Sequence, residues 1–165
     1  MPFTPYHLGP ALMITAAIRR LDMAVLLLFS IVLDIEPLLF GLFGGGFVHG
    51  FFHSYLGSSL VAIFGSVGIW LLWRRVGPFL SFFKVQLKSN RVLLASAIAG
   101  VYSHVFLDSF LYPEMSPLFP FQGNLMYRPE LNLTIYSLCL CSLVVAIPIF
   151  FLTRSRFWGK IWGKR

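Results

Sequence analysis

Histidine and acidic side chains in this chain are few, and their spacing is typical of a metal site. The four histidines are His7, His49, His53 and His104. His104 and Asp108 are four positions apart, so on a helix both side chains project from one face. His49 and His53 have the same spacing, provided that a helix begins before Gly50. Imidazole and carboxylate groups together are the ligands of zinc and similar divalent ions.

The apolar runs that carry these residues have the composition of membrane helices. Of the 165 residues, 58% are hydrophobic and only 12% are charged, whereas soluble domains carry about 25% charged residues. Several uncharged runs approach or reach the length that crosses a hydrocarbon core of about 30 Å. We therefore expect an all-α integral membrane bundle of about five helices, a single domain over residues 1–165. No basic region or cleavage site of a signal peptide is apparent at the N-terminus.

The apolar runs and their breaks predict the order of the elements. Two short helices, 8–18 and 23–33, should form a hairpin that does not cross the membrane completely, and three longer helices should cover 54–73, 92–111 and 131–153. Between them we expect a glycine-rich connector at 38–48, an interfacial helix at 76–91 and a proline-rich loop at 112–130, the last a lid or an entrance for lipid.

The polar residues alternate between helix starts and helix ends. Successive helices joined by short loops run antiparallel, so all of these residues should meet at one side of the bundle. Twelve of the thirteen Lys and Arg residues fall on the opposite side, the exception being Arg128. By the positive-inside rule, that basic side and the C-terminus are cytoplasmic. We expect an inner (cytoplasmic) membrane protein whose His/Asp site faces the non-cytoplasmic side.

Ionisable groups at membrane depth are costly and are usually functional. A divalent cation, with Zn²⁺ the expected ion, would offset this cost, and one or two ions fit the number of ligands. The expected metal ligands are His7, Asp34, His53, His104 and Asp108. Glu36 is a further ligand or a helix-ending residue, and His49 is a ligand or a residue that positions one. Either Glu36 or His49 is also the expected catalytic residue, as general base or as an orienting group. The basic residues occur in short clusters between apolar runs, so nucleic acid is not an expected partner.

Five segments resemble the family of LexA-regulated, membrane-bound metal-dependent hydrolases. They are TPYHLGPAL at the N-terminus, LDIEP at 33–37, HGFFHS at 49–54, SHVFLD at 103–108 and the PLFPF that follows. The resemblance implies a membrane enzyme that binds metal through its His and Asp residues, at positions His7, Asp34, His53, His104 and Asp108. The family commonly shows His-Arg-Gly-x-Thr-His-Ser, and here His49 stands where the arginine is usual.

The order of the ligands also resembles the all-helical zinc phospholipase C and nuclease type, and that likeness implies phosphoester hydrolysis. The leading hypothesis is thus a membrane metal-dependent hydrolase acting on an amphiphilic substrate, a phosphoester lipid. The alternative is a non-enzymatic metal-binding membrane protein: a carrier, sensor or structural subunit. Ionisable groups in only one half of the bilayer favour a one-sided site over a conduction path. A lipid acyltransferase would be expected to carry a His-x4-Asp motif, whereas this chain has His104-x3-Asp108.

Overall fold

The computed structural model describes residues 5–44, 49–81 and 89–162, and in this part of the chain the fold is all-helical. The helices are α1 (Pro5–Ala17), α2 (Met23–Phe29), α3 (Ile35–Phe43), α4 (Tyr55–Ser81), α5 (Asn90–Leu111) and α6 (Asn132–Trp162). Three short 3₁₀ turns complete the order: η1 (Val32–Asp34), η2 (Phe51–His53) and η3 (Pro129–Leu131). The prediction of an α-helical bundle is confirmed.

Four helical segments are long and apolar enough to cross a membrane. They are Met23–Phe43, Tyr55–Gly77, Asn90–Leu111 and Pro129–Ile149. The first of these joins α2, η1 and α3, so the second predicted helix is wrong in length. Residues 38–43 belong to α3 rather than to a connector, and Gly44 follows at a positive φ of 77°. Of the two helices expected to stop short of crossing the membrane, only α1 is that short. The second continues past Pro37, because the residues that follow are apolar.

The fourth helix also differs from its prediction. Tyr55–Ser81 runs through Gly77-Pro78, so residues 76–81 extend α4 instead of starting a separate interfacial helix. Residues 89–91 lead into α5, and the remainder of that predicted helix, 82–88, lies outside the described residues.

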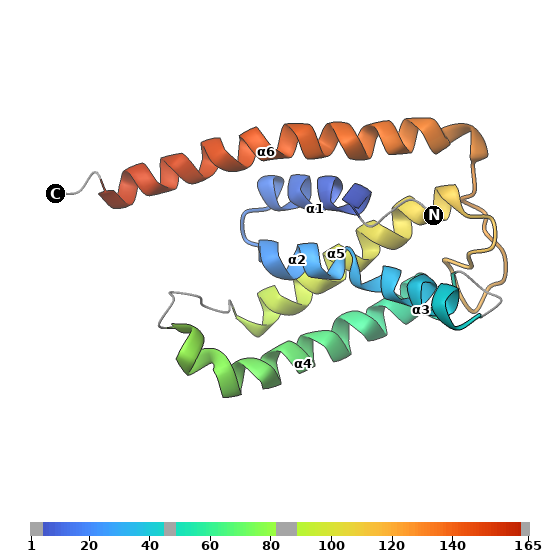
Figure 1. Ribbon diagram of the computed structural model, residues 1–165, viewed down its shortest axis with the longest axis horizontal. Helices are drawn as coiled ribbons and strands as arrows, with labels where there is room; N and C mark the ends of the chain where they lie inside the picture. Colours follow the sequence, from blue (N-terminus) through green and yellow to red (C-terminus); the bar gives the residue numbers. More distant parts are fainter. Residues whose placement is uncertain (1–4, 45–48, 82–88, 163–165) are drawn as a thin grey trace.

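Helix α5 occupies the centre of the bundle. It packs against α2 and α4, while α1 lies between α2 and α6 (Figure 1). The apolar core lies where these helices meet, and its buried members are Val25, Phe29, Leu33, Ala62, Leu93, Ala97, Val101, Val105 and Met115. Gly100 permits the close approach of α5 to α2, because a Cβ there would lie 2.7 Å from the Leu26 carbonyl oxygen. Small residues at such crossings are typical of helices packed in membranes.

The two ends of the bundle differ in character. The α1–α2 turn, which contains Arg19 and Arg20, lies at the same end as the last turn of α6 and the start of α5 (Figure 1). The 112–128 loop and α3 lie at the other end (Figure 1). This loop is held to the helices: the Asn124 side-chain amide donates to the Ser109 and Tyr112 carbonyls at 2.6 and 2.7 Å, and the Tyr55 N–H donates to the Pro117 carbonyl at 2.9 Å.

Candidate metal centre

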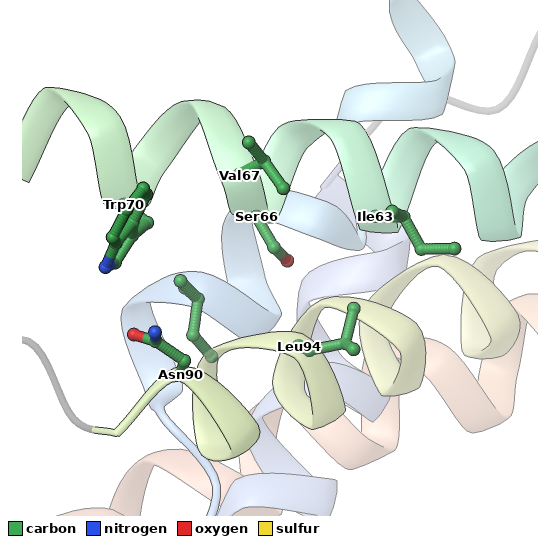
Figure 2. A pocket seen from close by; sticks show the side chains of 7 residues that line it. Ile63, Ser66, Val67, Trp70, Asn90 and Leu94 are labelled. Atoms are coloured by element: carbon green, nitrogen blue, oxygen red, sulfur yellow. The ribbon is translucent and has the colours of Figure 1, made fainter.

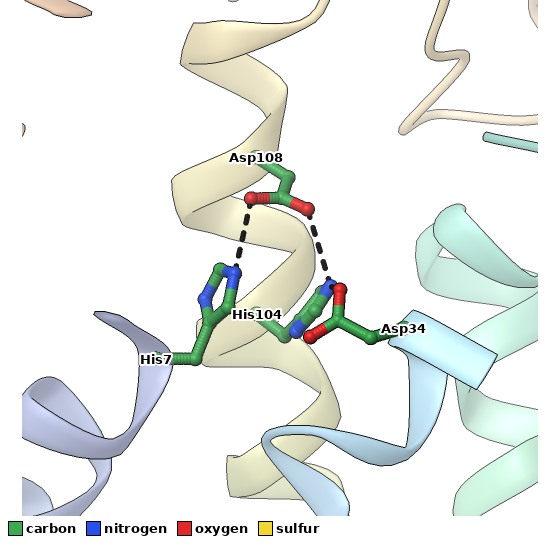
Figure 3. A group of neighbouring side chains, drawn as sticks. All are labelled: His7, Asp34, His104 and Asp108. Carbon is green, nitrogen blue, oxygen red and sulfur yellow. Dashed lines mark ion pairs between the residues drawn. The ribbon is translucent and has the colours of Figure 1, made fainter. Parts of the chain in front are cut away.

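Four of the five predicted ligands form one cluster at the non-basic end of the bundle. His7 comes from the first turn of α1, Asp34 from η1, and His104 and Asp108 from α5, and the four side chains face one another (Figure 3). One potential ligand atom from each lies within 4.8 Å of all the others. His7 Nε2 is 3.3 Å from Asp108 Oδ1, and His104 Nε2 is 3.2 Å from Asp108 Oδ2. Asp34 Oδ1 is 3.7 Å from His104 Nε2.

The fifth predicted ligand, His53, lies in a second cluster with His49 and Asp108. Ligand atoms of these three residues also lie within 4.8 Å of one another, and all three side chains are buried. The condition under which a helix would bring His49 and His53 together, a helix that begins before Gly50, is not met. His49 lies in a bend before Gly50, and η2 covers only Phe51–His53. This turn brings the centroids of the two imidazole rings to 4.9 Å from each other.

Several buried polar atoms in these clusters have no hydrogen-bond partner. Among the described side chains they include Asp34 Oδ2, His53 Nε2, His104 Nε2 and Asp108 Oδ1. An unsatisfied polar group of this kind costs about 1–3 kcal/mol, and more when it is charged. A divalent cation accepts lone pairs from imidazole nitrogen and carboxylate oxygen together, so the donor set fits such an ion. The structure thus gives a physical reason to place a metal among these residues.

Three histidines are oriented by a contact to their other ring nitrogen. His104 Nδ1 is 2.8 Å from the Ser30 carbonyl oxygen, His53 Nδ1 is 2.6 Å from Glu36 Oε2, and His49 Nδ1 is 2.9 Å from Glu114 Oε1. An Nδ1–H that donates to each oxygen leaves the Nε2 lone pair free. This arrangement is the one that metal-binding histidines usually have.

The contact of His104 with Ser30 also explains why Asp34 lies in a 3₁₀ turn. In a continuous α-helix the Ser30 carbonyl would accept the Asp34 N–H, but here that N–H donates to the Ile31 carbonyl at 3.1 Å. The His104 ring takes the Ser30 carbonyl instead. The sequence predicts that Asp34 ends a helix. In the structure it lies instead at an interruption within the Met23–Phe43 segment.

Glu36 lies beside the second cluster and contacts His53 directly. Its carboxylate also lies against Gly50, where an added Cβ would be 2.5 Å from Glu36 Oε1. A side chain at position 50 would displace the carboxylate, so the glycine makes room for the Glu36–His53 contact. Among the roles left open for Glu36, this geometry favours positioning of His53.

Two residues near His49 received no specific role from the sequence. Glu114 accepts from His49, and the Tyr112 ring lies 4.0 Å from the His49 ring. Burial lowers the pKa of His49 below 6.5, which the hydrogen bond to Glu114 opposes. Burial, with a contribution from Asp108, raises the pKa of Tyr112, so its phenol stays protonated at neutral pH. Tyr112 continues the spacing of His104 and Asp108 by a further four positions, whereas no local spacing identifies Glu114.

The basic residue of the loop does not reach the clusters. Arg128 Nη1 donates to the Leu125 and Tyr127 carbonyls at 3.3 and 2.7 Å, and its side chain is exposed. The guanidinium group of Arg128 is thus held by backbone carbonyls of its own loop.

A cavity of about 290 Å³ lies between α4 and α5 and is separate from the metal clusters. Its lining residues are Ile63, Ser66, Val67, Trp70, Asn90, Leu93 and Leu94 (Figure 2). Asn90 precedes His104 by fourteen positions on α5, which is about 21 Å along the helix. The lining contains none of the expected metal ligands.

Comparisons with protein-family models, with curated proteins and with solved structures found no match to this chain.

Proposed function

We propose that this chain is a membrane-embedded, metal-dependent hydrolase that acts on an amphiphilic substrate, a phosphoester lipid. The observation that carries the proposal is the convergence of buried imidazole and carboxylate groups whose inward atoms have no hydrogen-bond partner. A divalent ion bound there, with Zn²⁺ expected, would lower the pKa of a coordinated water and polarise an ester or phosphoryl oxygen. Membership in the LexA-regulated membrane hydrolase family belongs to the same proposal.

The residues have distinct roles in this proposal. His7, Asp34, His53, His104 and Asp108 hold metal, and His49 joins them through the second cluster. Glu36 and the Ser30 carbonyl orient His53 and His104 by accepting from their Nδ1 atoms. Glu114 does the same for His49 and, being partly exposed, marks the side of the centre nearest to solvent.

An amphiphilic substrate is supported by the surroundings of the centre. The clusters lie among helices long and apolar enough to span a membrane. The adjoining loop exposes large apolar side chains, which are Leu118, Phe119, Phe121 and Leu125. Such a surface suits the boundary between headgroups and acyl chains. A substrate with an apolar tail and a polar ester could reach the clusters from this boundary.

The proposal is tested on protein purified in detergent, stripped with a chelator and reloaded with Zn²⁺. We expect wild type to hold zinc by elemental analysis and to hydrolyse a chromogenic phosphodiester or fluorescent phospholipids. Asp34→Ala and His104→Ala should hold less zinc than wild type and lose activity. Glu130→Gln, which removes an exposed carboxylate outside both clusters, should keep both.

Two results would contradict the proposal. Equal zinc content in wild type, Asp34→Ala and His104→Ala would remove the metal centre and the hydrolase with it. Zinc that depends on both residues, without hydrolysis of any ester offered, would favour the non-enzymatic alternative of a carrier, sensor or structural subunit.

A further inference from the structure

The six candidate ligands fall into two groups that share one residue. The first group is His7, Asp34, His104 and Asp108, and the second is His49, His53 and Asp108. Two ligands of one zinc ion lie at about 2.0–2.2 Å from it, so they cannot be more than about 4.4 Å apart. Among the described residues the six do not form one group even within 4.8 Å. A single ion therefore does not account for all of them.

Each group has its own unsatisfied atoms and its own orienting contact. His104 Nε2 and Asp34 Oδ2 have no hydrogen-bond partner in the first group, and His53 Nε2 has none in the second. The Ser30 carbonyl orients His104, and Glu36 orients His53. Each group therefore has a buried donor atom and an oriented histidine of its own.

The charge of the region also fits two ions. Asp34, Asp108, Glu36 and Glu114 contribute four carboxylates, each within ion-pair distance of a histidine. With neutral imidazoles, two divalent cations balance these four negative charges, whereas one ion balances only two of them.

From these observations we infer a dinuclear centre in which Asp108 is shared by two unequal metal ions. The inference rests on the metal centre of the proposed function and goes further by assigning ligands to each ion. The first group supplies four protein ligands, the number typical of closed zinc sites. The second supplies three, the number in zinc sites that keep a position for water or substrate. His49 of this second group contacts the partly exposed Glu114. The ion nearer the 112–128 loop is thus the one open to substrate.

The experiment is a metal titration of the chelator-stripped full chain, followed by elemental analysis and Mn²⁺ electron paramagnetic resonance. Wild type should bind two ions per chain, and the second equivalent of Mn²⁺ should produce an exchange-coupled spectrum. His53→Gln and Asp34→Asn should each keep one ion and lose the coupling, the former emptying the three-ligand site. Asp108→Asn should weaken both sites, and Glu130→Gln should behave as wild type.

The wild-type spectrum needs no substitution, so the inference can be tested even if a variant fails to fold. One ion per wild-type chain, with no coupled spectrum at any loading, would overturn the dinuclear assignment and leave a mononuclear hydrolase standing. Two coupled ions without hydrolysis would support the assignment and contradict the proposed function instead. Loss of both ions in His53→Gln, in protein that remains monodisperse and helical, would also count against two separate ligand groups.

Discussion

At the scale of single residues, the histidines of this chain are held in one orientation by fixed acceptors. Ser30, Glu36 and Glu114 take one ring nitrogen each of His104, His53 and His49. The remaining nitrogens of His104 and His53 are buried and lack hydrogen-bond partners. Rings held in this way lose little conformational entropy when they bind an ion, which is the physical basis of preorganised metal sites.

Removing the charge of Glu36 should weaken metal binding without removing a metal ligand. In Glu36→Gln the acceptor of His53 becomes neutral, so the ring is a weaker base and is less firmly oriented. We expect zinc affinity to fall by about 10–100-fold, measured by competition with a chromogenic chelator. Glu130→Gln is the matched control, since its carboxylate is exposed on η3. Unchanged affinity in Glu36→Gln would show that the 2.6 Å contact with His53 does not position a ligand.

At the scale of elements, the site depends on an interrupted helix packed against a central one. The break at η1 turns Asp34 toward α5, and it occurs where the Ser30 carbonyl is taken by a side chain of that helix. Asp34 lies eleven positions after Met23 and nine before Phe43, or about 17 and 14 Å along a helix. Asp34 therefore lies near the middle of this segment, whereas Asp108 lies three residues before the end of α5, so the centre lies in the half of the bundle nearer the 112–128 loop.

The close packing of α5 on α2 gives a stability prediction with an internal control. In Gly100→Ala the new methyl group would lie 2.7 Å from the Leu26 carbonyl and 2.9 Å from Phe29 Cβ. The backbone cannot move away easily, so we expect the free energy of unfolding to fall by about 1–3 kcal/mol. The fall should be visible as a lower midpoint of thermal unfolding in detergent. Gly68→Ala on α4 meets nothing within 4 Å and should be neutral or slightly stabilising. Equal midpoints for the two variants would refute this account of the α2–α5 contact.

At the scale of the whole molecule, the two ends of the bundle are chemically different. The 112–128 loop lies at one end, and the α1–α2 turn with its arginines lies at the other (Figure 1). The candidate metal centre includes His7 from the first turn of α1 and Asp108 from the last turn of α5. A protein inserted with its basic end in the cytoplasm would present the centre to the opposite compartment.

This orientation can be measured by labelling single cysteines with a membrane-impermeant maleimide in intact cells. In a background with Cys139 and Cys141 replaced by alanine, Glu114→Cys should be labelled from outside and Ser89→Cys only after permeabilisation. Both positions are exposed, so a difference between them would report the compartment and not burial. The reverse pattern would place the centre on the cytoplasmic side.

The helical class and the candidate ligands could be predicted from the sequence for a simple reason. Uncharged apolar runs of this length must satisfy their backbone hydrogen bonds internally, which in a membrane requires helices. The alternation of polar residues between run starts and run ends then places them on one side. On that reasoning we expect the ligands to converge. The structure brings four of them together, namely His7, Asp34, His104 and Asp108.

Only the tertiary structure decided how these residues are divided and oriented. The break at Asp34 depends on a contact between residues 74 positions apart, from His104 to Ser30. The His49–Glu114 contact joins positions 65 apart, and no local pattern signals it. The sequence predicts a glycine-rich connector from residue 38, but α3 continues to Phe43 because its apolar side chains favour it. Apolar periodicity is local and readable along the chain, whereas the pairing of polar groups depends on which helices pack together.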